Sequence, residues 1–404
     1  MTDRTACHLC GAEAGVVAAD GGTSGLDDLG GVTSDCRPWP DRMPLAVCGT
    51  CGTVQKAVTE GWRARCRDIY ASYRVYRQGE GGEQAVFGAG SGMGVARSLL
   101  LLTKVLETLS PPDEGRLLDL GCGDGTLLRH AARLRPGWRL TGTDLGDHYR
   151  PAIEAIAGVE RFHTGDLADL PGRYGLATAL HVLEHVEGPE GFLRSVGKRL
   201  DPQGRLIVEV PDVEANPFDL LVVDHATHFS AATLSRSLRQ AGFAVALCRR
   251  DWIPREISAI AVPAGRGDGL EDAPPADPAR ARRLVEGHVR WLRRLRDETR
   301  ARAEDGGVGL FGTSIAASWL AGRLGTEHVR FFVDEDPARA GTSYLGRPVL
   351  APGDVPAGAT VCMPMTPAMA AGIIGRSKGE RFALIPPPDL PPPGLPPLGL
   401  PGSD

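Results

Sequence analysis

A glycine-rich turn between an apolar strand and an apolar helix start constrains this chain more than any other segment. Residues 117–128 read Leu-Leu-Asp-Leu-Gly-Cys-Gly-Asp-Gly-Thr-Leu-Leu. Gly121, Gly123 and Gly125 let the backbone turn sharply and touch a ligand without interference from a Cβ atom. The helix start then offers unpaired N–H groups to that ligand. Thr126 stands where the dinucleotide fingerprint G-x-G-x-x-G has its third glycine, so the turn disfavours NAD.

Short apolar runs alternate with helical stretches from residue 117 to 263, as a doubly wound parallel sheet requires. Two later β-like segments fit a closing antiparallel pair. We therefore predict an α/β fold built on a seven-stranded Rossmann-like sheet. Its strands are expected at 117–120, 139–144, 160–164, 176–181, 205–210, 243–249 and 256–262.

Asp119 lies two residues before the first glycine and completes the pattern D-x-G-x-G-x-G. This pattern resembles the first motif of class I methyltransferases, which use S-adenosylmethionine (SAM), and the seven predicted strands match the fold of that class. SAM carries an adenine, a ribose and a charged amino-acid end. We expect Asp119 to support the glycine turn and that amino-acid end.

Two further acids follow the next predicted strands. Asp144 ends the strand Leu-Thr-Gly-Thr-Asp, where a carboxylate can accept hydrogen bonds from both ribose hydroxyls. Asp166 follows the third strand, where this fold places a carboxylate near the adenine amino group. The alternative for both acids is a helix cap or a turn. The predicted cofactor contacts are Asp119, Gly121, Gly123, Gly125, Asp144, Leu145, Asp166, Leu167 and His181.

His181-Val-Leu-Glu-His185 spells H-x-x-E-H, a string that one class of zinc proteases uses. That motif must lie on one continuous helix, whereas His181 falls at the end of the fourth predicted strand. The segment resembles instead the strand-4 motif of methyltransferases, which commonly ends in Glu-His. We expect His181 to face the methyl donor and the acceptor, and Glu184 and His185 to be structural or to form the site wall.

Four cysteines near the N-terminus form two C-x-x-C pairs, Cys7 with Cys10 and Cys48 with Cys51. Each pair is followed by glycine, which lets backbone amides turn toward a thiolate. Four thiolates suit tetrahedral zinc, and a site without an open position is structural. The alternative is four ordinary free thiols. Cys36 and Cys66 are not needed as ligands.

Composition is that of an ordinary soluble protein. The 404 residues include 45 basic and 50 acidic side chains, a net charge of −5 that gives no reason to expect nucleic acid or an anionic membrane as partner. No apolar run approaches the ~20 residues of a membrane span, and the N-terminus lacks the build of a signal peptide. We expect a cytoplasmic enzyme.

The chain is predicted to comprise five parts. The C-terminal α/β part begins with a strand near Val308, and the helical stretch before it places apolar residues at helical spacing between arginines. The parts are a zinc-binding module (1–75), a methyltransferase core (76–263), a linker with an amphipathic helix (264–305), a small Rossmann-like domain (306–385) and a Pro-rich tail (386–404).

The acceptor side is expected after the fifth strand. In this fold that segment lies over the methyl group, so Asp224, His225 and His228 should point toward the acceptor. A histidine beside a carboxylate is suited to be a general base. The alternative is a capping cluster, in which Ser230 caps the next helix and the histidines pack around it.

The order of these parts resembles the three-domain sugar C-methyltransferases, which branch deoxysugars on nucleotide carriers. The resemblance includes a tyrosine-rich join at Tyr70, Tyr73 and Tyr76, and C-terminal segments at Leu310–Ser314, Val333–Pro337 and Gly346–Pro348. In that family a Tyr-His-Glu-His run supplies the base through its last histidine. The matching run here is Val222-Val223-Asp224-His225, which keeps that histidine and shortens the acid.

The resemblance implies that His225 removes a proton alpha to a sugar ketone and that Asp224 orients His225. Tyr73 or Tyr76 would bind the oxyanion or the diphosphate, His181 would face donor and acceptor, and the C-terminal unit would help to hold the nucleotide. The predicted function is SAM-dependent C-methylation of a nucleotide-linked keto sugar in a secondary-metabolite, such as antibiotic, or surface-glycan pathway. The alternatives are methyl transfer to oxygen or nitrogen of another small molecule, and a SAM-binding module without catalysis.

Overall fold

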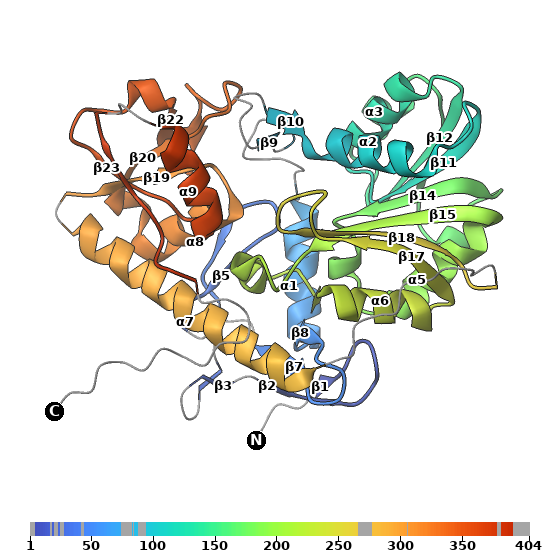
Figure 1. Ribbon diagram of the computed structural model, residues 1–404, viewed down its shortest axis with the longest axis horizontal. Coiled ribbons are helices and arrows are strands. Elements are labelled where there is room, and N and C mark those ends of the chain that lie inside the picture. Colours follow the sequence, from blue (N-terminus) through green and yellow to red (C-terminus); the bar gives the residue numbers. More distant parts are fainter. Residues whose placement is uncertain are drawn as a thin grey trace.

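The computed structural model describes most of the chain and is shown in Figure 1. The described residues are 5–16, 18–19, 23–24, 28–41, 44–73, 83, 85–87, 94–265, 277–304, 306–377 and 381–390. Among them, no helix is both long enough and apolar enough to cross a membrane.

A seven-stranded sheet forms the central part, in the order β13-β12-β11-β14-β15-β18-β17. All neighbours are parallel except β18, which is antiparallel to both β15 and β17. The strand order reverses between β11 and β14, and ligands of open α/β sheets bind in the crevice at such a point. The strands are β11 (Gly115–Leu120), β12 (Trp138–Asp144), β13 (Val159–Thr164), β14 (Tyr174–Leu180), β15 (Leu200–Pro211), β17 (Phe243–Arg249) and β18 (Glu256–Pro263).

Helices cover both faces of this sheet, as Figure 1 shows. Apolar residues of α2 and α3 pack on one face, and those of α5 and α6 pack on the other. The predicted strand positions agree with the structure to within two residues, except that β15 begins at Leu200, five residues before the predicted start. The helices are α2 (Arg97–Leu109), α3 (Thr126–Leu134), α4 (Arg150–Glu154), α5 (Pro189–Arg199) and α6 (Ala231–Gln240), with short 3₁₀ turns η2 (Leu167–Asp169), η3 (Leu183–His185) and η4 (Pro217–Leu221).

The N-terminal part is a small five-stranded sheet that borrows its last strand from residues 227–228. The order is β1-β2-β7-β8-β16, and β16 is antiparallel to β8. These strands are β1 (Thr5–Ala6), β2 (Glu13–Val16), β7 (Leu45–Cys48), β8 (Val54–Lys56) and β16 (Thr227–His228). The helix α1 (Glu60–Ala71) follows them, and the pairs β3 (Ala18–Ala19) with β4 (Thr23–Ser24), β5 (Gly31–Val32) with β6 (Pro38–Trp39), and β9 (Ala85–Phe87) with β10 (Gly94–Ala96) lie outside that sheet.

The C-terminal part has its own sheet, in the order β21-β22-β20-β19-β23-β24. It is parallel apart from the β21–β22 pair. Its elements are β19 (Val308–Phe311), α8 (Ile315–Leu324), η5 (Thr326–His328), β20 (Val329–Val333), β21 (Ser343–Tyr344), β22 (Arg347–Leu350), η6 (Pro352–Asp354), β23 (Thr360–Cys362), α9 (Pro367–Arg376) and β24 (Ala383–Ile385).

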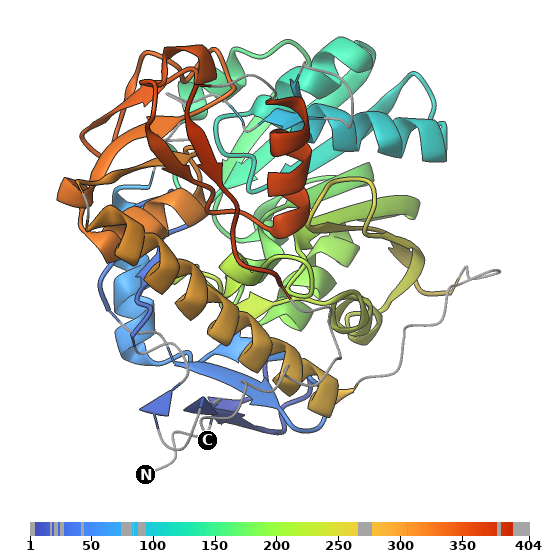
Figure 2. The ribbon, with the colours of Figure 1, turned by 60° about the vertical axis from the view of Figure 1, so that its left-hand side comes forward.

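One long helix, α7 (Pro278–Ala303), runs from the N-terminal strands to the C-terminal sheet, as Figure 2 shows. Its buried face joins a hydrophobic core that also contains Val54 of β8, Phe218 of η4 and Trp319 of α8. Trp319 also donates its ring N–H to the Leu29 carbonyl oxygen at 2.8 Å. The segment expected to carry the acceptor chemistry is therefore held between the N-terminal part and the C-terminal part.

Candidate functional site

The glycine turn after β11 makes the sharp backbone turn that its sequence predicts. Gly121 has φ 63° and Gly125 has φ 83°, both in the left-handed region that favours glycine. A Cβ atom at Gly121 would lie 2.5 Å from Cγ2 of Val182, and one at Gly125 would lie 2.7 Å from Cδ1 of Ile156. Neither position has room for a side chain, so the turn keeps its backbone open to a ligand.

Asp144 lies beside this turn at the end of β12. Its carboxylate accepts hydrogen bonds from the N–H groups of Gly123 at 2.8 Å and of Leu145 at 2.7 Å. Each oxygen keeps a second lone pair for a hydroxyl donor. Gly123, Asp144 and Leu145 line the same cavity, which suits the ribose contact predicted for Asp144.

The other two predicted acids have local partners. Asp119 is buried and accepts a hydrogen bond from the Thr178 hydroxyl at 2.7 Å, and burial raises its pKa to about 7. Asp166 accepts from the N–H of Ala168 at 2.8 Å and caps η2. Its neighbours Gly165 and Leu167 line the cavity, but Asp166 does not. The structure thus places Asp166 in the turn that was its alternative role.

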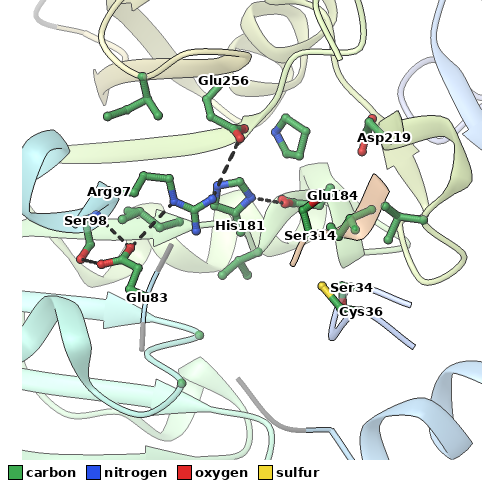
Figure 3. A pocket seen from close by; sticks show the side chains of 18 of the residues that line it. Ser34, Cys36, Glu83, Arg97, Ser98, His181, Glu184, Asp219, Glu256 and Ser314 are labelled. Atoms are coloured by element: carbon green, nitrogen blue, oxygen red, sulfur yellow. Dashed lines mark hydrogen bonds and ion pairs between the residues drawn. The ribbon is translucent and has the colours of Figure 1, made fainter. Parts of the chain in front are cut away.

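The cavity has a volume of about 1630 Å³ and lies between all three parts of the molecule. The carboxyl edge of the central sheet forms one wall, including His181, Glu184, His185 and His225. The N-terminal part contributes Ser34, Cys36, Tyr70 and Tyr73, and the C-terminal part contributes Thr313, Ser314, Asp334, Asp336 and Arg339. Figure 3 shows this cavity with Ser34, Cys36 and Ser314 across from His181.

His225 lies in the cavity wall and is bonded to an acid that differs from the expected one. Its Nδ1 donates to Oδ1 of Asp219 at 2.6 Å, and Nδ1 of His228 donates to Oδ2 of the same carboxylate at 2.7 Å. Burial opposes protonation of His225, but the hydrogen bond and charge of Asp219 raise its pKa above the usual value. The two histidines hold the pKa of Asp219 well below its usual range, although burial opposes this.

The prediction that Asp224 orients His225 is therefore corrected. The Asp224 carboxylate accepts hydrogen bonds from the Ser34 N–H at 2.9 Å and from the Ser34 hydroxyl at 2.5 Å. It points toward the N-terminal part because Val223, its neighbour, donates its N–H to the Val32 carbonyl oxygen at 2.9 Å. The predicted capping role of Ser230 is present too, since Ser230 caps α6.

His181 directly follows β14 in an unusual backbone conformation, with φ 54°, and lies among buried acids. Its Nδ1 lies 3.1 Å from Glu184 Oε1, and its Nε2 lies 3.4 Å from Glu209 and 3.8 Å from Glu256 (Figure 3). Burial and Arg97 oppose its protonation, but the three acids raise its pKa to about 10. His181 is not on one helix with His185, because η3 spans only Leu183–His185, so the protease geometry is absent from this described segment.

Two tyrosines of the predicted join reach the cavity, while Tyr76 lies outside the described residues. The Tyr70 hydroxyl lies 3.0 Å from Nδ1 of His185. Burial raises the pKa of both Tyr70 and Tyr73, so each stays a neutral hydroxyl that can donate a hydrogen bond.

The four N-terminal cysteines come together, as their spacing predicts. Their Sγ atoms all lie within 4.8 Å of one another, and the Cys7–Cys51 and Cys10–Cys48 pairs are 3.5 Å apart. In each C-x-x-C turn, the N–H of the following glycine donates to the carbonyl oxygen of the first cysteine at 3.0 Å. This donor set and spacing suit a tetrahedral thiolate site for zinc.

Sequence reasoning missed Asp219, Lys56, Glu209 and Glu256. Asp219 stands in a run of buried apolar residues, Phe218 to Val223, where an acid is unusual unless it is paired. An acid within this apolar run is therefore a signal, readable from the sequence, that Asp219 has a buried partner. The sequence has no such signal for Lys56, because Lys56 lies far along the chain from Leu220, whose carbonyl oxygen it contacts.

Comparison with known proteins finds relatives of the central part of the chain. A family described as "Methyltransferase domain" matches residues 96–247. The mitochondrial ubiquinone biosynthesis O-methyltransferase of Schizosaccharomyces pombe is 26% identical over 36% of this chain and 57% of its own length. The ubiquinone biosynthesis O-methyltransferase of Xanthomonas euvesicatoria is 32% identical over 27% of this chain and 48% of its own.

A SAM-dependent methyltransferase structure from Clostridium acetobutylicum is 12% identical, with a TM-score of 0.35, over 51% of this chain and 99% of its own. The chain spans about half the length of the curated relatives that it matches. The family match, residues 96–247, lies in the central part, which has the strand order and glycine turn described above. Residues 96–247 of this chain therefore form a methyltransferase domain of the SAM-dependent class I type.

Proposed function

We propose that this chain methylates a carbon beside the ketone of a nucleotide-linked deoxysugar, with His225 as general base. The observation that carries the proposal is the pairing of His225 with Asp219 at 2.6 Å, in the wall of the cavity that also holds the glycine turn. The hydrogen bond at Nδ1 leaves Nε2 as the atom that takes a proton. The Asp219 carboxylate stabilises the imidazolium that results.

When bound, SAM supplies a methyl group on a positively charged sulfur. The residues that would hold it are Asp144 for the ribose, and Gly121, Gly123 and Gly125 for the amino-acid end. His225 Nε2 takes the proton from the carbon beside the ketone, and the electron pair of that C–H bond becomes the enolate. A tyrosine hydroxyl of the join, Tyr70 or Tyr73, donates a hydrogen bond to the enolate oxygen.

The C-terminal unit is suited to hold the diphosphate of the acceptor. Arg339 is buried and donates to the carbonyl and hydroxyl oxygens of Thr313 at 2.9 and 2.7 Å. Its NH2 group has no hydrogen-bond partner among the described residues, and Arg339 lines the cavity. The N-terminus of α8, capped by Ser314, opens onto the same cavity. A guanidinium beside a helix N-terminus binds phosphate oxygens.

We also propose that the four cysteines hold a structural zinc ion. Their four sulfur atoms lie within 4.8 Å of one another, close enough to bind one ion. The metal would hold the two C-x-x-C turns together, so its binding would add to the stability of the small N-terminal sheet.

A second acceptor chemistry is favoured by the names of the curated relatives, which are O-methyltransferases. His225 can take a proton from a hydroxyl as well as from carbon. The two chemistries differ in where the new methyl group resides, and the same assay separates them.

The test uses purified protein with SAM and a panel of nucleotide-linked 4-keto-hexoses. We expect mass spectrometry to show the gain of one methyl group, and solvent deuterium to enter the carbon beside the ketone when SAM is omitted. His225→Ala should abolish both, whereas His328→Ala, a change at a half-exposed histidine of the C-terminal part, should leave both intact. Methylation of a hydroxyl without deuterium exchange would replace C-methylation with O-methylation. Exchange that survives in His225→Ala would remove His225 as the base.

A further inference from the structure

A buried lysine from the N-terminal part lies behind the pair of histidines bonded to Asp219. Lys56 is the last residue of β8, and only 1% of its surface is exposed. Its ammonium group donates to the carbonyl oxygen of Leu220, the residue after Asp219. A buried lysine is costly unless it is paired, so this contact has a structural or functional reason.

The two histidines have equivalent bonds to Asp219 but different surroundings. His225 faces Glu184 from η3 and Asp224 from its own loop, and both acids favour its protonation. His228 is fully enclosed, with Lys56 from β8 nearby, and its Nε2 has no hydrogen-bond partner among the described residues. Other titratable groups facing the pair are His185 from η3 and His288 from α7. The anions thus lie near His225, and the cation lies near His228.

The pKa values of His228 and Lys56 reflect this uneven distribution of charge around the two histidines. Burial, reinforced by the Lys56 charge, lowers the pKa of His228 to about 4 despite Asp219. Burial also lowers the pKa of Lys56 to about 7, although Asp219 and Asp224 oppose that shift. Below neutral pH, where Lys56 is charged, a proton entering the pair is therefore held on His225. His228 stays neutral and fixes the Asp219 carboxylate through its Nδ1–H.

The backbone fixes Lys56 in this place. The N–H of Lys56 donates to the Ala226 carbonyl oxygen at 2.9 Å, and β8 pairs with β16 through Gln55 with Thr227 and Val54 with His228. A side-chain contact adds to this, because Nδ1 of His8 lies 2.9 Å from the Thr227 hydroxyl. His228 thus lies on β16, the edge strand of the cysteine-bearing sheet, three residues after His225.

We propose that Lys56 is a positioning residue that assigns the proton of the Asp219-bridged pair to His225 and not to His228. This rests on the proposed role of His225 as the base. Only His225 lines the cavity, so a proton placed on His228 would not be exchanged with a substrate. The N-terminal part is then a component of the catalytic machinery, because β8 supplies Lys56.

The test is an NMR titration of protein labelled with ¹³C at the histidine Cε1 atoms, which requires no acceptor. The signals are assigned with His225→Asn and His228→Asn. In the unmodified protein, His225 should titrate and His228 should stay neutral between about pH 5 and pH 8. In Lys56→Met, the midpoint of His228 should rise by about one pH unit or more, because the Lys56 charge that opposes its protonation is gone.

Lys56→Arg keeps the charge and should leave His228 neutral, and Lys198→Met, on an exposed lysine of α5, should change neither signal. Unchanged midpoints in a folded Lys56→Met protein would overturn the proposal. If that variant does not fold, the unmodified protein still decides, because a His228 that titrates at or above the midpoint of His225 also overturns it. The readout does not involve methyl transfer, so failure of turnover on keto sugars would remove the proposed function and leave this result standing.

Discussion

At the scale of single residues, Gly121 has the tightest surroundings in the cofactor turn. Its φ of 63° and the 2.5 Å approach of Val182 leave no position for a Cβ atom. Gly121→Ala should therefore weaken SAM binding by about tenfold or more, measured by isothermal titration calorimetry, because the turn must shift. Gly146→Ala is a matched control on the same cavity wall, since a Cβ there meets nothing within 4 Å. Equal affinities for the two variants would show that the turn does not touch the cofactor.

His181 should make the free energy of unfolding decrease as the pH rises above neutral. Its pKa is raised to about 10 in the folded chain by Glu256, Glu184 and Glu209, against an unfolded value near 6.5. The stability that it contributes is complete below the unfolded pKa and is lost as pH rises toward the folded pKa. Urea unfolding from pH 7 to pH 10 should show this loss, and His181→Gln should show less of it. If the unfolding free energy of the variant depends on pH in the same way as that of the unmodified protein, the prediction that His181 is protonated at neutral pH is wrong.

At the scale of elements, the cysteine site should decide whether β7 and β8 are ordered. We expect elemental analysis to find one zinc ion per chain, and Cys48→Ser to lose it together with a large part of the thermal stability. Cys248→Ser, in β17 of the central sheet, should keep both the metal and the stability. A Cys48→Ser protein with the original melting temperature would show that the four sulfurs have no structural metal.

The elements also show which features the sequence could predict. The glycine turn, the strand end at Asp144 and each of the two cysteine pairs are local patterns, because each is fixed by residues close together in the chain. Asp219 as the partner of His225 was missed, because Asp224 is adjacent in sequence and yet its side chain is held by Ser34.

The contact of Lys56 with residue 220 could not be predicted for a different reason. The pairing of β8 with β16 joins residues more than 160 positions apart. Because β16 has only two residues, it is too short for apolar periodicity to identify β8 as its partner strand. A short edge strand has few side chains that specify its register. The acceptor half of the cavity is assembled from such distant pieces, whereas the donor half comes from one continuous α/β unit.

At the scale of the whole molecule, the N-terminal part, η4, α7 and the C-terminal sheet share one hydrophobic core, so we expect them to unfold together. Trp319 of α8 is the decisive residue, because it is 1% exposed, packs against Phe218 and donates to the Leu29 carbonyl oxygen. Trp319→Ala should cost about 3–5 kcal/mol of unfolding free energy.

Hydrogen exchange distinguishes a shared core from separate domains. In Trp319→Ala, amides of β7 and β8 should lose protection along with those of β19, although they lie in different sheets. Ile374→Ala, a change on α9 at a side chain that is 38% exposed, should alter neither. Loss of protection in the C-terminal sheet alone would mean that the cavity lies between independently stable domains. Ser34 and Arg339, which line the cavity from the N-terminal and C-terminal parts, would then move apart when either domain opens. The distance between the acceptor and the base His225 would in that case be set by the binding of the acceptor.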